Sequence, residues 1–225
     1  SLSDPDSKLR HKPGQRKHLV HRAQVAVDPK NRVIVAVEAE PATGSEHEVL
    51  PTLVGRARFA GHAAREVAAD SGYASRDSYE QAAGLGVLAY IPPKPNAAYQ
   101  DAIDARALMR TPAGVGAKID RMVHAEGAIS ELKRHGLTRA RGRGTRKLQL
   151  QLLAAATAIN LKRLLAHSDA QDATDAQDQD RAALHPARAS TPGQRLATAT
   201  ALLALLTATL DEIGRFTTSD TSTGS

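Results

Sequence analysis

The order of the strand-forming segments limits what this chain can fold into. Two segments rich in β-branched residues, 20–27 and 32–39, are separated by the turn sequence DPKN and predict an antiparallel hairpin. Further along, short apolar runs at 66–69 and 87–91 flank a segment, 77–83, that predicts a helix. A strand, a helix and a second strand in this order predict a parallel pair with a right-handed crossover. The sequence therefore indicates an α/β domain.

Capping patterns predict where two helices begin. Ser45 with Glu48, and Asp77 with Glu80, each have the spacing of a capping box. The first pair predicts a helix at 46–59, kinked by its proline, and the second predicts the start of the helix in the β-α-β unit.

The other segments divide into expected loops and helices. Residues 1–19 are polar, basic and rich in turn formers, so we expect an arm or loop, and 94–117 predicts a connection with one helical turn. Residues 148–165 are the strongest helix in the sequence. Its buried face is expected to contain Leu148, Leu152, Ala155, Ile159 and Leu165.

The composition changes after the strong helix. We expect one domain at 1–166, followed by a disordered linker at 167–195 that is rich in Ala, Asp, Gln and Thr. An isolated helix at 196–213 and a disordered tail at 214–225 complete the predicted organisation.

A carboxylate interrupts an apolar stripe in residues 118–135. At 3.6 residues per turn, Glu126 falls in the middle of the stripe and Lys133 lies about two turns further along it. Burying an unpaired carboxylate is unfavourable, so its position favours a functional site. The alternative is an ordinary Glu/Lys pair on a half-exposed helix. The apolar members of the stripe are Ile119, Met122, Val123 and Ile129.

Positive charge is concentrated in one segment. The chain has 30 Lys and Arg against 24 Asp and Glu, which favours a polyanionic partner such as nucleic acid. The absence of cysteine excludes disulfides and cysteine-ligated zinc, and no apolar run reaches about 18 residues, so we expect a soluble intracellular protein without a membrane segment. Residues 133–147 contain no acid and form either a DNA-backbone contact or a solvated loop. Their basic side chains are Lys133, Arg134, Arg139, Arg141, Arg143, Arg146 and Lys147.

Asp70 ends the apolar run at 66–69 and is followed at once by the turn residues SGY. A carboxylate at the carboxyl end of a buried strand is typical of sites in α/β sheets. If Glu126 converges on the same point, two carboxylates can bind Mg²⁺ or Mn²⁺ and activate water or a 3′-hydroxyl for attack on a phosphodiester. The alternative is that Asp70 only caps its own turn.

Three stretches of the sequence carry a family resemblance. They are VHRAQVAVDPKNRVIVAVEAEPATGSEHEVLPTL, VAADSGYASRDSYEQAAGLGVLAYIP and RMVHAEGAISELKRHGLTRARGRGTRKLQLQLLAAATAINLKRLL. The most specific parts are the DSGY turn that begins at Asp70, the spacing of Glu126 and Lys133, the RG-rich turn and the segment NLKRL. In this order they resemble the ribonuclease H-like domain of bacterial insertion-sequence transposases of the DDE class, over roughly residues 1–166.

The resemblance implies a fold and an activity. It implies a central mixed sheet with helices on both sides, with Asp70 and Glu126 as metal ligands and Lys133 as a DNA contact. The implied reaction is Mg²⁺- or Mn²⁺-dependent hydrolysis of double-stranded DNA at transposon ends, followed by strand transfer. A homodimer in the cytoplasm, associated with the nucleoid, is the implied setting.

The sequence also departs from the family pattern. The family's first catalytic Asp lies on a strand before the hairpin, and Asp4 and Asp6 resemble the polar stretch that follows that strand. The family's Tyr and Arg ahead of the Glu are replaced by Ile119 and Met122, with Arg121 the nearest base. We therefore expect an N-terminally truncated core that is inactive by itself. The alternatives are a non-catalytic DNA-binding remnant and a decaying reading frame.

Overall fold

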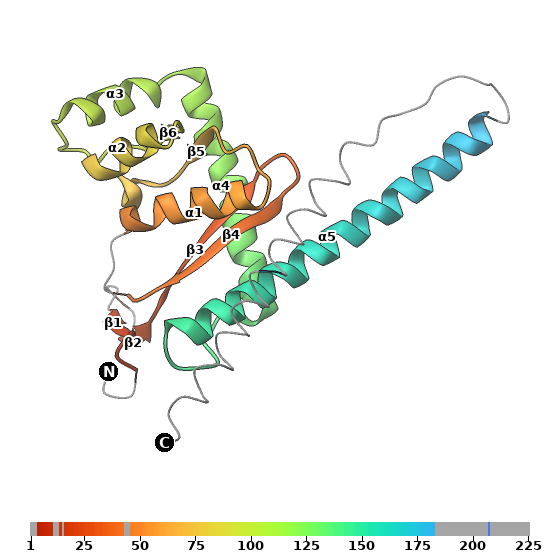
Figure 1. Cartoon of the computed structure of the whole chain (residues 1–225), viewed down its shortest axis with the longest axis horizontal. Helices are drawn as coiled ribbons and strands as arrows, with labels where there is room; N and C mark the ends of the chain where they lie inside the picture. The colour runs from red at the N-terminus through yellow and green to blue at the C-terminus, as the bar shows by residue number, and fades with distance from the viewer. Residues whose placement is uncertain (1–3, 11–13, 15, 43–45, 183–206, 208–225) are drawn as a thin grey trace.

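The computed structural model describes residues 4–10, 14, 16–42, 46–182 and 207 (Figure 1). Its strands pair two by two: β1 with β2 and β3 with β4 are antiparallel, whereas β5 with β6 is parallel. The strands are β1 (Lys8–Arg10), β2 (His18–Val20), β3 (Arg22–Asp28), β4 (Val33–Glu40), β5 (Glu66–Ala68) and β6 (Leu88–Tyr90).

Helices connect and cover these strand pairs. The chain is thus a mixed α/β structure, although in the described part of the chain the pairs do not join into the single mixed sheet that the resemblance implies. The helices are η1 (Glu46–Val49), α1 (Leu50–Phe59), η2 (Ser71–Tyr73), α2 (Arg76–Gly84), α3 (Gln100–Leu108), α4 (Pro112–Leu132), the π-helical turn η3 (Lys133–Leu137) and α5 (Thr145–Ala182).

The predicted hairpin is confirmed as β3 and β4. Residues 33–37 of β4 are all buried, which requires cover on both faces of the strand. Val33 and Val35 pack with Ala57 of α1, whereas Ile34 and Val37 pack with α4 and α5. The hairpin is therefore the middle layer between α1 on one side and α4 and α5 on the other (Figure 1).

The β-α-β unit is also confirmed, with a different cap. Strands β5 and β6 are parallel and are joined through α2. The N-cap of α2 is Ser75 rather than Asp77, because Ser75 has extended backbone angles and its hydroxyl accepts a hydrogen bond from the Ser78 N–H at 3.0 Å.

Two segments have more regular structure than the sequence predicts. Residues 1–19, expected as an arm or loop, contribute the exposed pair β1 and β2. Residues 94–117, expected to hold one helical turn, contain α3 and the start of α4. Thr111 caps α4 through the Gly114 N–H at 3.1 Å, and Pro112 occupies its first turn, where its missing N–H costs nothing.

Helix α5 is longer than predicted. Of its expected buried face only Leu165, 56 % exposed, is not buried. The helix continues to Ala182 through residues where we expect a disordered linker, and this part extends away from the body (Figure 1). Residues 167–182 contain neither glycine nor proline and are rich in alanine, the best helix former. No helix in the part of the chain described is long and apolar enough to cross a membrane. The predicted cap Ser45 and nearly all of the helix predicted at 196–213 lie outside the described residues.

The buried face of α4 is not the one that the sequence predicts. Ile119, Met122, Val123 and Ile129 are 39–57 % exposed, and Glu126 between them is exposed as well. The residues that α4 buries are Gly114, Ala128 and Leu132. Small side chains on this face let the helix approach the strands closely, so the larger apolar stripe faces outward.

Candidate functional site

A groove separates β3 from β5. Its volume is about 550 Å³, and its walls are formed by β3, β5, α1 and the middle of α4. Most of the wall residues from the two strands are alanine or valine. The two strands therefore give the groove mainly apolar walls, and charged side chains, among them Asp70, also line it.

Side-chain contacts connect the two strands that flank the groove. Near the start of β3, the Gln24 side chain accepts a hydrogen bond of 2.6 Å from the Tyr73 hydroxyl, in the turn after β5. Further along β3, Ala26 packs in one cluster with Ala64, which precedes β5, and in another with Tyr73, which follows it. Residues on both sides of β5 along the chain therefore pack in clusters with β3.

Each flanking strand has one unused edge. Among the residues that the structure describes, β3 pairs only with β4, and β5 pairs only with β6. Both free edges border the groove, which lies between the two sheets. An exposed row of backbone N–H and C=O groups is a template for pairing with another strand.

Asp70 is positioned by the turn that follows β5. Its Oδ1 accepts a hydrogen bond from the Gly72 N–H at 2.8 Å, so it caps the short helix η2, as the alternative interpretation of the sequence predicts. The side chain is exposed and borders the groove. Capping its turn fixes where the carboxylate lies.

Glu126 is not among the residues that line the groove. The residues of α4 that line the groove are Ala117, Asp120, Arg121, His124, Ala125 and Ile129. The prediction that Glu126 is buried is therefore wrong. Its pairing with Asp70 stays a prediction. Within the described part of the chain, no three His, Asp or Glu side chains are grouped as a metal site.

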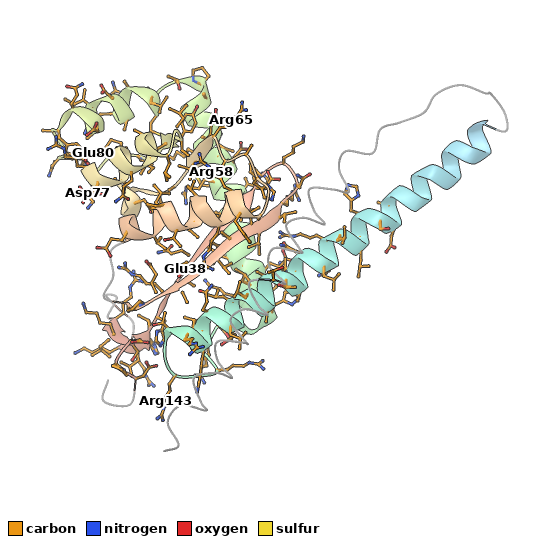
Figure 2. The ribbon with its side chains drawn as sticks, viewed as in Figure 1. Glu38, Arg58, Arg65, Asp77, Glu80 and Arg143 are labelled. Carbon is orange, nitrogen blue, oxygen red and sulfur yellow. The ribbon has the colours of Figure 1, made fainter. Side chains whose placement is uncertain are left out.

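The seven basic residues at 133–147, which we call the basic patch, are all exposed. They follow one another along η3, the bends after it and the first turn of α5. Figure 2 shows Arg143 at one end of the molecule, far from Arg58 and Arg65. One continuous exposed segment therefore carries all of this charge, and Lys and Arg side chains are among the groups that contact the phosphates of a DNA backbone.

One residue that organises the basic patch was missed by the sequence analysis. Gln151 of α5 accepts a hydrogen bond from the Arg141 N–H at 2.9 Å and donates to the carbonyls of Gly136 and Arg139 at 3.1 and 3.0 Å. Its side chain therefore fixes the backbone of residues 136–141, the middle of the turn between α4 and α5. Its spacing in the sequence gives no signal, because the turn that it contacts is irregular.

Comparison with known proteins gives one match. A family model described as Transposase DDE domain matches residues 3–161, more than half of the 225-residue chain. No curated protein and no solved structure matches the chain. The match includes the DSGY turn, Glu126 and the basic patch. This chain belongs to the transposase DDE domain family.

Proposed function

We propose that the chain is part of the catalytic core of a DDE transposase, which cleaves DNA at transposon ends and transfers the strand, and that it is inactive without one further strand. The groove between β3 and β5 is the observation that carries the proposal. A ribonuclease H-like sheet needs a strand that joins these two pairs, and within the described ranges both edges that such a strand would use are unpaired.

We propose that the joining strand lies antiparallel to β3 and parallel to β5. Its carboxyl end would then lie beside the carboxyl end of β5, which Asp70 follows after one residue. An Asp at the end of that strand would supply the carboxylate that the sequence analysis finds missing.

Enzymes of this family generally use divalent metal ions, which would polarise the phosphodiester and activate the attacking oxygen. The described residues do not fit such an ion by themselves. Asp70 is next to the groove, whereas Glu126 is on the exposed side of α4. We therefore assign no catalytic step to the chain alone, and we propose Asp70, Glu126 and an added Asp as the complete set.

The test is a Mg²⁺-dependent nicking assay on duplex DNA carrying transposon ends. We expect no cleavage by the 225-residue chain. An N-terminal extension that adds one apolar strand ending in Asp should restore it, and the same strand ending in Asn serves as the matched control. Asp70→Asn and Glu126→Gln should each abolish the restored cleavage. Robust nicking by the unextended chain, lost on Asp70→Asn, would contradict the proposal.

A second candidate function is DNA binding without catalysis, which the exposed basic patch favours. Seven bases that neutralise about five phosphates give a slope of around −4.5 for log K against log salt. Replacing Arg139, Arg141 and Arg143 together with alanine should make that slope less steep by two to three units, at about 0.9 per phosphate. An unchanged slope would mean that the patch is only a solvated loop. In a cell, such binding would keep the protein on the nucleoid.

A further inference from the structure

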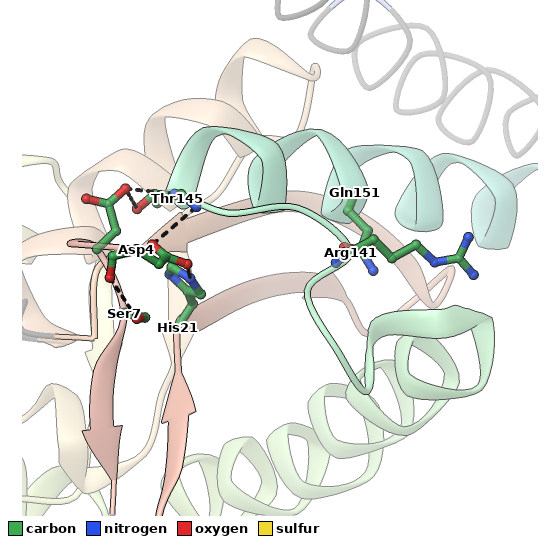
Figure 3. A network of polar contacts seen from close by, with 8 residues as sticks. Asp4, Ser7, His21, Arg141, Thr145 and Gln151 are labelled. Atoms are coloured by element: carbon green, nitrogen blue, oxygen red, sulfur yellow. Dashed lines mark hydrogen bonds and ion pairs between the residues drawn. The ribbon is translucent and has the colours of Figure 1, made fainter. Parts of the chain in front are cut away.

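The N-terminal segment, residues 4–7, contacts the end of the basic patch, from which it is distant in the sequence. Asp6 Oδ2 accepts hydrogen bonds from the Thr145 N–H and the Thr145 hydroxyl, both at 2.8 Å. Asp4 Oδ1 accepts one from the Gly144 N–H at 3.3 Å. The bonded residues are 139 and 140 positions apart in the sequence, and Figure 3 shows this network beside the turn held by Gln151.

Both acids are themselves held in place. Asp4 Oδ2 is 3.0 Å from His21 Nε2, and the Asp4 carbonyl accepts a bond of 2.8 Å from the Ser7 hydroxyl. The Asp6 carbonyl accepts a bond from the Ala42 N–H at 3.3 Å. The segment is thus fixed to the open end of the β3–β4 hairpin, through His21 before β3 and Ala42 after β4.

The environment keeps both carboxylates charged at neutral pH. Partial burial alone would raise the pKa of Asp4, but hydrogen bonds from His21 and Gly144 together lower it below its usual value. The pKa of Asp6 is lowered mainly by the two hydrogen bonds from Thr145. Thr145 begins α5, where unpaired N–H groups favour a negative charge.

Charge alone gives these acids the wrong sign for DNA binding. Two carboxylates beside a basic patch repel phosphate and weaken its attraction. Their geometry suggests the opposite effect, because they fix Gly144 and Thr145, directly between Arg143 and Arg146. A turn that is already ordered loses less conformational entropy when it binds.

We propose that Asp4 and Asp6 form a latch that positions the end of the basic patch for contact with a nucleic acid backbone. Gln151 fixes the middle of the same turn, and the latch fixes its junction with α5. This inference rests on the DNA binding proposed above. Asp4 and Asp6 act through the turn and are positioning residues.

Two substitutions at one position separate hydrogen bonding from charge. Asp6→Ala and Asp6→Asn remove the same negative charge, but the asparagine oxygen can still accept both bonds from Thr145. Asp77→Ala is the distant control, because Asp77 is exposed and lies at the opposite end of the body from Arg143 (Figure 2). Circular dichroism confirms that each variant folds.

Binding to a duplex is measured across a salt series. We expect Asp6→Ala to weaken binding about fivefold, the typical effect of losing a helix cap, with a slope less steep by about one. Asp6→Asn should keep the original slope, and Asp77→Ala should bind as tightly as the unmodified chain or more tightly. If Asp6→Ala binds as tightly as Asp77→Ala, the acids act only through charge and the latch is overturned.

Amide exchange separates the latch from DNA binding. If the unmodified chain binds no duplex, the DNA-binding proposal fails on its own. Faster exchange of the Thr145 amide in Asp6→Ala, but not in Asp6→Asn, would still support the latch. Unchanged exchange in both variants would overturn it.

Discussion

The two outer edges of the β3–β4 hairpin differ in the hydrogen-bond partners of their backbone groups. The β4 edge is closed by side-chain amides from α5: Asn160 bonds both the N–H and the C=O of Ile34, at 3.0 and 2.8 Å. Gln149 accepts from the Ala39 N–H at 2.6 Å and donates to the Val37 carbonyl at 3.1 Å. The β3 edge borders the groove and pairs with no further strand among the described residues.

The difference shows at which edge this chain supplies partners for the backbone groups. Backbone N–H and C=O groups that are buried without partners destabilise a fold, and α5 supplies those partners to β4 with two fully or nearly buried amides. The β3 edge has only the open groove beside it. The comparison therefore supports a hairpin that is complete on one side and ready for a strand on the other.

The largest expected effect is at the closed edge. Asn160→Leu keeps the branched shape of the side chain but leaves the Ile34 N–H and C=O buried and unpaired, which should lower the free energy of unfolding by about 3 kcal/mol. Urea denaturation measures the loss. Leu165→Ala, at a 56 % exposed position of the same helix, should change it by less than about 0.5 kcal/mol. A loss below about 1 kcal/mol in Asn160→Leu would mean that the amide does not close this edge.

The open edge can be mapped residue by residue. Val37 and Ala39 direct backbone groups at Gln149, so these groups point away from β3. Their partners across the antiparallel pair are Val25 and Ala23. In an antiparallel pair, two opposed residues either bond each other or both turn their backbone groups away from the partner strand. Val25 and Ala23 therefore turn their N–H groups away from β4 and toward the groove.

Hydrogen exchange tests this assignment. The amides of Ala23 and Val25 should exchange about 100-fold faster than those of Gln24 and Ala26, which bond to β4; the ratio corresponds to ~3 kcal/mol of protection. Adding a strand to the groove should remove the difference. Equal protection of all four amides in the unextended chain would mean that the β3 edge is already paired.

A smaller effect is expected where one hydrogen bond spans the groove. Tyr73→Phe removes the hydroxyl that donates to Gln24, which should lower the free energy of unfolding by about 1 kcal/mol. The control is Tyr90→Phe, since Tyr90 is a buried tyrosine that lines the same groove, from β6. If both variants lose the same amount, the bond between β3 and the DSGY turn makes no special contribution.

The smallest effect is acid sensitivity at the start of α5. The folded-state pKa values of Asp4 and Asp6 lie below the ordinary 3.8, so their stabilisation is present above about that pH and is lost as the pH falls through the folded values. The Thr145 amide resonance should titrate with a midpoint below 3.8, and Asp6→Asn should remove that titration. A midpoint at or above 3.8 would mean that the bonds from Thr145 do not stabilise the charged carboxylate.

The sequence by itself determined the local elements and the family. Alternating β-branched residues and turn formers were sufficient for the β3–β4 hairpin, because a hairpin is a contact between neighbours in the sequence. The β5–α2–β6 unit and the exposed basic patch follow from equally local patterns. The motifs DSGY and Glu-x₆-Lys were sufficient to recognise the family that the comparison confirms.

The tertiary structure decided which face of each helix is used and what closes each edge. Apolar periodicity placed Ile119, Met122 and Glu126 on one stripe of α4, but the rotation of a helix about its axis depends on what its partner can accept. Here close packing selected Ala128 on another face. The contacts of Asp6, Gln151 and Asn160 join segments that are distant in sequence or irregular in structure. No local sequence pattern therefore predicts them. The three-dimensional arrangement alone brings these polar side chains to backbone groups that would otherwise lack partners.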